Sequence, residues 1–295
     1  MDNQAEIREF LTSRRAKITP EQAGLPSGAR RRVPGLRRSE VAALADVSVE
    51  YYAKLERGNL AGVSPAVLEA VARALQLDDA ERAHLLNLAQ AADGTDVLTR
   101  PRRRTTRAWS PHRSLQWVLD AVTAGPAFVR NGRMDILAAN QLARAFYADI
   151  YATSGNQANL ARFNFLDPAS RRFYPDWDQA ADMAVAILRT EAGRNPHDKD
   201  LHDLVGELST RSDDFRTRWG AHNVRHHGTG TKRFHHHTVG DLTLAYEGLE
   251  MTAERGLSLT IYAAEPGSPS EEGLRLLASW AATQDAGSPT EQGAG

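Results

Sequence analysis

The sequence predicts a multidomain protein, in which an all-α five-helix domain is followed by an α+β domain. Up to residue 92, apolar residues recur at the three- and four-residue intervals of helices. The later part combines helices with segments of alternating polarity, which indicate strands. A stretch with prolines and arginines separates the two parts. We therefore expect domains at 1–92 and 112–283, a basic linker at 93–111 and a disordered tail at 284–295.

The composition narrows the class of protein. A chain of 295 residues is long enough for two domains. It has no cysteine, which excludes disulfides, thiolate zinc sites and thiol catalysis. The N-terminus is charged where a signal peptide would be apolar, and nowhere do eighteen apolar residues run together. We expect a cytoplasmic protein without a membrane span.

Charge is distributed unevenly along the chain. Residues 1–107 contain 18 lysines and arginines against 14 acidic residues, and the remainder contains 18 against 23. A basic first part and an acidic second part suit one domain that meets phosphates and one that does not. The five arginines of the linker segment RPRRRTTR are either simply solvated or follow a DNA backbone.

Residues 35–58 predict two short helices joined by a tight turn. The first begins near Arg38, and Asp46 follows it with a side chain that tolerates the left-handed backbone of a sharp turn. Ser48 is a good N-cap for a second helix that starts at Val49, and Gly58 can end that helix. This is the geometry of a helix-turn-helix, which presents its second helix to the major groove.

The outward face of the second helix supplies the candidate base readers. With Tyr52 and Leu55 buried, the residues expected to reach base edges are Val49, Glu50, Tyr51 and Lys54. Glu50 can accept from a cytosine amino group and Lys54 can donate to guanine. The residues expected to contact phosphates are Arg30, Arg31, Arg32, Arg37, Arg38 and Ser48. Because one such module buries little surface, we expect a homodimer on an inverted repeat of double-stranded DNA.

The other helices of the first domain carry clear end signals. A first helix is expected over residues 3–16. Ser64 before Pro65 predicts the start of a fourth helix, and Asp78 with Glu81 forms a capping box for a fifth.

The second domain is predicted to combine a hairpin, several helices and three closing strands. Asn131-Gly132 indicates a type I′ hairpin turn, and Asn140 stands at the start of the next helix. Strands are expected at 231–239, 242–249 and 257–264, with a turn at Gly240-Asp241, before a last helix over 270–283. This order of elements is that of a PAS-like sensor domain.

Two resemblances follow from these residues. Residues 35–58 resemble the Xre-type helix-turn-helix. Together with ITPEQAGLPSGARRRVPGLRR, NLARFNFLDP, STRSDDFRTRW and AHNVRHHGTGTKRFHHHTVGDLTLAYE, the chain over about residues 5–282 resembles the MmyB-like transcription regulators. One departure is His237, where the family pattern has proline. The resemblance implies a transcription regulator whose PAS-like ligand-binding domain has a pocket that can hold a long-chain fatty acid.

The candidate ligand residues are aromatic and imidazole side chains. Candidates for apolar pocket walls are Phe165, Phe173, Tyr174, Trp219 and Tyr246, and candidates to donate to an anionic head group are His222 and His236. Taken singly, each aromatic residue is better explained as part of the core than as a pocket wall. The resemblance is what favours ligand binding.

The histidine-rich segment 222–237 raises the question of a metal site. His235 and His237 would share one face of a strand, but no acidic residue lies between Asp214 and Asp241, so we expect no metal. Phosphate-binding glycine loops, zinc-protease motifs and nucleophile elbows are also missing, so we expect no enzyme and no cofactor apart from a bound fatty acid or similar apolar ligand. The alternatives are a metal-dependent enzyme and a protein- or RNA-binding module.

Overall fold

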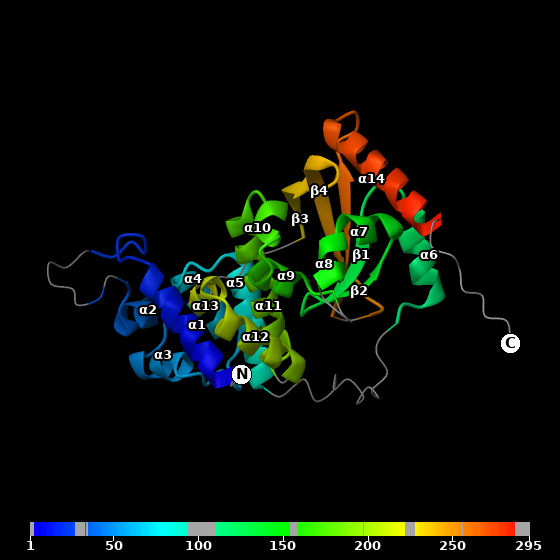
Figure 1. The fold of residues 1–295 in the computed structure, drawn as a ribbon. Helices are drawn as coiled ribbons and strands as arrows, with labels where there is room; N and C mark the ends of the chain where they lie inside the picture. Colours follow the sequence, from blue (N-terminus) through cyan, green and yellow to red (C-terminus); the bar gives the residue numbers. More distant parts are fainter. Residues whose placement is uncertain are drawn as a thin grey trace. The chain divides into compact units, whose positions relative to one another are not determined.

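The computed structural model describes residues 3–26, 33, 35–93, 110–153, 158–196, 198–221, 228–254 and 256–286 (Figure 1). The chain forms two compact units. The first combines Met1–Thr106 with Val185–His226, and the second combines Arg107–Ala184 with His227–Gly295. An all-helical part therefore precedes an α+β part, as predicted, while the domain boundaries expected from the sequence remain a prediction.

Five helices open the first unit. They are α1 (Asn3–Lys17), α2 (Arg38–Leu44), α3 (Val49–Glu56), α4 (Pro65–Ala74) and α5 (Asp79–Ala92). The predicted caps are confirmed: the Ser64 hydroxyl accepts from the Val67 N–H at 3.4 Å, and Asp78 and Glu81 cap each other's backbone N–H. Apolar residues from all five helices form one core, with Ile7, Phe10, Tyr52 and Leu88 fully buried.

The first unit also contains a segment from later in the chain. Helix α11 (Trp177–Arg194) ends in this unit, and α12 (Lys199–Arg211) and α13 (Asp213–Gly220) follow it. Buried Arg189 of α11 pairs with Glu6 of α1, and Lys17 Nζ donates to the Ala221 carbonyl at 3.3 Å. Sequence periodicity predicts these helices but not where they pack.

The second unit is built on an antiparallel sheet of five strands in the order β2-β1-β5-β4-β3. The strands are β1 (Ala127–Asn131), β2 (Ile136–Ala139), β3 (Thr229–His236), β4 (Gly240–Glu250) and β5 (Leu257–Ala264). The three closing strands match the prediction within a few residues. The turn between β3 and β4 comprises His237–Val239, slightly before the predicted position, and Gly240 begins β4 with φ of 75°.

Helices cover both faces of this sheet. The helices of this unit are α6 (Arg113–Ala121), α7 (Gln141–Phe146), α8 (Ala148–Thr153), α9 (Leu160–Leu166), α10 (Ser170–Phe173), the start of α11, and α14 (Pro269–Ala286). Leu115 and Leu119 of α6 pack on Ala127 and Val129 of β1, whereas Phe128 contacts aromatic rings on the opposite face. Successive strand residues point to opposite faces, so α6 lies on one side and the aromatic cluster on the other.

The β1–β2 hairpin differs from the predicted type I′ turn. That turn requires positive φ at both central residues, but here only Met134 has it, with φ of 66°. The Met134 N–H donates to the Asn131 carbonyl at 3.1 Å, and the Asn131 N–H donates to the Asp135 carbonyl at 3.2 Å. This is a three-residue loop whose last residue is left-handed, so the prediction from the Asn131-Gly132 dipeptide was wrong by one residue in loop length.

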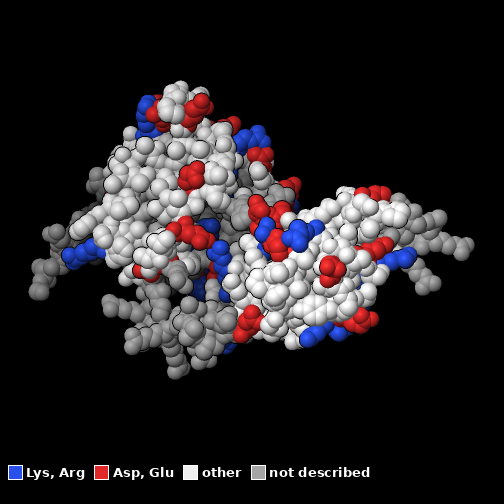
Figure 2. Space-filling view, turned by 180° about the vertical axis from the view of Figure 1, so that it is seen from behind, with Lys and Arg blue, Asp and Glu red and all other residues white. Residues whose placement is uncertain are grey.

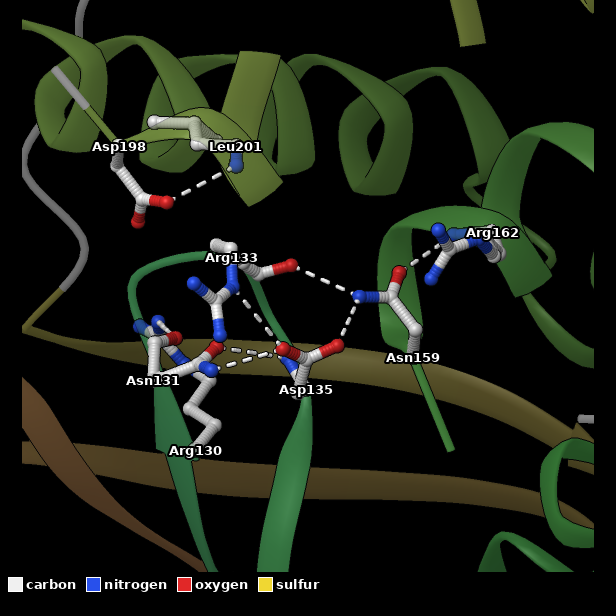
Figure 3. Close-up of polar contacts among 8 residues, drawn as sticks. All are labelled: Arg130, Asn131, Arg133, Asp135, Asn159, Arg162, Asp198 and Leu201. Carbon is white, nitrogen blue, oxygen red and sulfur yellow. Dashed lines mark hydrogen bonds and ion pairs between the residues drawn. The ribbon is translucent and has the colours of Figure 1, made fainter. Parts of the chain in front are cut away.

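A buried carboxylate explains why the longer loop is preferred. Figure 3 shows Asp135 accepting from the side chains of Asn131 at 2.8 Å and Arg133 at 3.3 Å. Asn159, which has no exposed surface, donates to Asp135 at 2.8 Å and to the Arg133 carbonyl at 2.9 Å. These contacts tie the loop to the start of α9 and satisfy a carboxylate that is almost fully buried. The sequence signal of a single dipeptide could not include them.

Within the part of the chain that the structure describes, no helix combines the length and the apolar character needed to cross a bilayer.

Candidate nucleic-acid interface and candidate ligand site

The turn between α2 and α3 has the predicted geometry. Asp46 adopts a left-handed conformation with φ of 53°, and the Val47 N–H donates back to the Ala42 carbonyl at 3.0 Å. The Ser48 hydroxyl accepts from the Tyr51 N–H at 3.0 Å and so caps α3. Gly58 ends the helix with φ of 96° at a point where an added Cβ would lie 2.5 Å from the Gln4 carbonyl oxygen. The two helices and the turn form a helix-turn-helix.

The two faces of α3 differ sharply in exposure. Tyr52 and Leu55 are buried in the core of the unit, whereas Val49, Glu50 and Lys54 are exposed. Tyr51 is only half-buried, because its ring packs against the same core. All four predicted base readers thus lie on α3 outside its buried face, and their role in reading bases stays a prediction.

A buried carboxylate at the end of α3 organises the arginines around it. Glu56 is 1% exposed, and its Oε1 accepts from Arg15 Nε of α1 at 2.7 Å and from the Thr12 hydroxyl at 3.3 Å. Its Oε2 pairs with Arg38 Nε at the start of α2. The hydrogen bond to Glu56 raises the pKa of Arg38. Arg15 also donates to the Leu36 carbonyl at 2.8 Å, so one carboxylate links α1, the loop before α2, α2 and α3.

The predicted phosphate contacts surround this network. Arg38 is 55% exposed despite its pairing with Glu56, and Arg37 is exposed at the N-cap of α2. Ser48 uses its oxygen as an acceptor in the cap, which leaves its O–H able to donate. Arg30, Arg31 and Arg32 lie outside the described residues. On the face of the molecule drawn in Figure 2, the described basic side chains lie among acidic ones.

The second unit contains a dense aromatic cluster on the face of the sheet opposite α6. Phe146 of α7 lies at its centre, with ring centroids 4.9 Å from Tyr147, 5.3 Å from Phe173 and 4.9 Å from Phe234. Further members are Phe128, Phe163, Tyr174, His236, Tyr246 and Tyr262. Every one of these side chains is buried.

Tyrosine hydroxyls provide the polar groups inside this cluster. The Tyr147 hydroxyl donates to the Tyr262 hydroxyl at 3.2 Å. Burial raises the pKa of Tyr147 and of Tyr174, and the neighbouring Tyr262 raises each further. These phenols therefore stay protonated and can donate hydrogen bonds inside an apolar environment.

Only some of the ligand-binding residues predicted from the sequence lie together in the structure. Phe173, Tyr174, His236 and Tyr246 all belong to the aromatic cluster, whereas Phe165 packs edge-on against Trp177 at 5.9 Å. Trp219 lies in the first unit, stacked on Phe215 at 5.5 Å. His222 lies outside the described residues.

His236 has structural partners for both ring nitrogens. Its Nδ1 accepts from the Thr238 N–H at 3.2 Å, so Nε2 carries the proton and donates to the Ala145 carbonyl at 3.3 Å. Burial lowers the pKa of His236, consistent with a neutral ring. The single N–H that was expected to reach a ligand head group is therefore used to join β3 to α7.

The neighbouring histidines do not form the pair that the strand pattern suggested. His237 lies in the turn after β3, with its ring stacked on His236 at 4.7 Å and 3.7 Å from an Asp149 oxygen. His235 is exposed and contacts Asp241 at 2.6 Å. Among the described residues, no three histidine, aspartate or glutamate side chains gather as a metal site would require.

Several residues of these sites were not predicted from the sequence. Glu56 lies four residues after the buried Tyr52, so a glutamate on the apolar face of α3 was a usable signal of a buried ion pair. Tyr147 and Tyr262 had no such signal, because an aromatic residue in a core helix or strand looks the same whether or not its hydroxyl meets another.

Comparisons with known proteins agree with this geometry. Residues 111–277 match the family model described as the MmyB-like transcription regulator ligand binding domain, which covers more than half of the chain. Residues 12–85 match the model of a helix-turn-helix domain, which includes α2 and α3. No curated protein matches the chain. The chain belongs to the MmyB-like transcription regulators and is a DNA-binding regulator of transcription with a ligand-binding domain.

Proposed function

We propose that α3 enters the major groove and reads a specific operator through Val49, Glu50, Tyr51 and Lys54. The observation that carries this proposal is the two-sided character of α3, which is anchored by Tyr52, Leu55 and Glu56 and presents polar groups outward. Arg30, Arg31, Arg32, Arg37, Arg38 and Ser48 hold phosphates on either side of the groove. This division of roles matches the general rule that phosphate contacts position a protein while base contacts specify the sequence.

The phosphate role is tested with Arg38→Ala against an operator selected from random DNA. Loss of one phosphate contact is expected to weaken binding to all sequences alike and to reduce the salt slope by about one unit. Arg73→Ala is the matched control, because Arg73 is an exposed arginine on α4, outside α2 and α3. If Arg38→Ala left both affinity and salt slope at the level of the control, Arg38 would not contact phosphate.

The base-reading role is tested with Glu50→Ala and Lys54→Ala. Each variant is expected to lose about 1 to 3 kcal/mol of discrimination at one base pair while its affinity for unrelated DNA stays unchanged. Selection from random DNA with each variant shows which position is relaxed. An equal loss on every sequence would instead assign these side chains to the backbone.

The regulator is proposed to act as a homodimer on an inverted repeat, because a single helix-turn-helix offers too small an interface for tight specific binding. Light scattering after size exclusion is expected to give the mass of two chains on a duplex with two half-sites. A single chain per duplex would contradict the proposal.

The proposed ligand is a small apolar molecule with an anionic end, such as a long-chain fatty acid. Support comes from the family membership and from a cluster that combines buried rings with the protonated hydroxyls of Tyr147 and Tyr174. Native mass spectrometry of the protein as isolated tests this. A co-purified mass in the fatty-acid range is expected, and Tyr174→Phe is expected to lower its occupancy. A polar metabolite in its place would refute the ligand class.

A further inference from the structure

Helix α11 is anchored in both compact units. Residues Trp177–Ala184 belong to the second unit and the helix ends in the first. At its start, the Trp177 indole N–H donates to the Asn164 carbonyl at 3.1 Å and to the Ser170 hydroxyl at 3.2 Å. The guanidinium of Arg171 lies 3.7 Å from the centre of the same ring. The first turn of α11 is thus held by residues of the ligand-binding half.

The last turns of α11 are held by a buried ion pair within the first unit. Arg189 has no exposed surface, pairs with Glu6 of α1 and donates to the Trp219 carbonyl. Its guanidinium also lies 4.2 Å from the centre of the Trp219 ring, and His84 of α5 is 3.8 Å from Glu6. Removing one partner from such a pair leaves an uncompensated buried charge, so the contact fixes one arrangement strongly.

Helix α1 connects this ion pair to the helix-turn-helix. Glu6 near its start faces Arg189, while Thr12 and Arg15 near its end hold Glu56 of α3. Glu56 in turn pairs with Arg38. The contacts therefore form an unbroken series within the first unit, from α11 through α1 and the end of α3 to the start of α2.

We infer that Arg189, near the end of α11, is a positioning residue for DNA affinity, because it fixes α1 and, through Glu56, the guanidinium of Arg38. This inference rests on the proposed phosphate contact of Arg38 for its functional meaning, but not for its structural test.

The structural test is hydrogen exchange on the full chain with Arg189→Met. Faster exchange is expected in α1 and also in α3, by tenfold or more, while β4 and β5 keep their wild-type rates. The control is Arg211→Met, which removes an arginine of the same unit that is 58% exposed and paired on the surface with Glu207. Faster exchange in α1 with wild-type rates in α3 would overturn the inference, since the perturbation would stop at α1.

A milder variant keeps the test decisive if Arg189→Met does not fold. Gly193 near the end of α11 faces His84, and an added Cβ would lie 2.7 Å from the ring. Gly193→Ala is therefore expected to displace the end of α11 and to speed exchange in α3. Gly206→Ala on α12 is the matched control, because its added Cβ would meet nothing within 4 Å. Equal rates in the two alanine variants would overturn the inference.

The functional test is a double-mutant cycle in DNA affinity between Arg189→Met and Arg38→Ala, with Gly193→Ala in place of the first if needed. Substitutions without shared partners normally add, whereas coupled ones do not. A departure from additivity of threefold or more supports the coupling, and additivity within twofold overturns it. If wild-type protein bound no specific duplex, the proposed function would fail, and hydrogen exchange would still decide the structural inference.

Discussion

Glu56→Gln should destabilise the helix-turn-helix, because the substitution removes the negative charge that pairs with Arg15 and Arg38. The pair with Arg15 is largely shielded from water, since the Arg15 side chain is 15% exposed and Glu56 is 1% exposed. A hydrogen bond to a charged group contributes about 1.5 to 3 kcal/mol to stability. Arg38 is more than half exposed, so its pair contributes at most about 1 kcal/mol. Glutamine has nearly the same volume as glutamate and keeps one hydrogen-bond acceptor, so only the charge is lost. We therefore expect the free energy of unfolding to fall by about 2 to 3 kcal/mol.

Hydrogen exchange of peptides from α1 and α3 is the suitable assay, because a chain with two compact units need not unfold in one step. A loss of 2 to 3 kcal/mol corresponds to exchange about 30- to 150-fold faster. Glu69→Gln is the matched control: this carboxylate also contacts two arginines, Arg73 and Arg82, but at the surface. Its exchange should change by less than about fivefold. Equal effects of the two substitutions would refute the argument from burial.

Three further predictions concern the backbone turns and a buried histidine. Asp46→Ala should destabilise the first unit by about 1 kcal/mol and Asp46→Gly should not, measured by hydrogen exchange of α3, because alanine is strained at a φ of 53°. Gly58→Ala should cost more than Gly62→Ala in the same measurement: both positions have positive φ, but only the first would place a Cβ against the Gln4 backbone. Burial lowers the pKa of His236, partly offset by the hydrogen bond to the Ala145 carbonyl and by Asp149, so the unfolded chain binds a proton that the folded chain rejects. Stability should therefore fall as pH drops below about 6.5, by at most about 1.4 kcal/mol per pH unit, and His236→Gln should remove this slope in urea titrations at pH 7.5 and 5.5.

Local sequence signals predicted the helix-turn-helix closely. The caps at Ser48, Ser64 and Asp78 and the left-handed residue Asp46 each depend on contacts within a few residues, and each is present in the structure. Such features depend on interactions between residues that are close in the sequence, so they can be predicted from the sequence alone. The prediction of an all-helical part before an α+β part held for the same reason.

Long-range contacts account for what the sequence did not reveal. The hairpin loop depends on Asn159, which lies 24 residues after Asp135. The partner of Glu6 is Arg189, which is separated from it by 183 positions. Likewise, the Ala145 carbonyl that contacts His236 Nε2 lies 91 positions earlier in the chain. No periodicity or dipeptide preference carries information of this kind, because it arises only when the fold brings distant segments together.

The grouping of Val185–His226 with the N-terminal helices bears on how this regulator can be divided. A fragment cut in the linker after α5 would contain the whole helix-turn-helix yet lose the side chain that neutralises Glu6. The carboxylate and the His84 ring, both buried in the full chain, would then face solvent. Exchange of sensor halves between related regulators would meet the same obstacle, because Val185–His226 would have to travel with the N-terminal helices. Along the sequence the two family matches stand in tandem, but the first compact unit also takes in residues from within the second match.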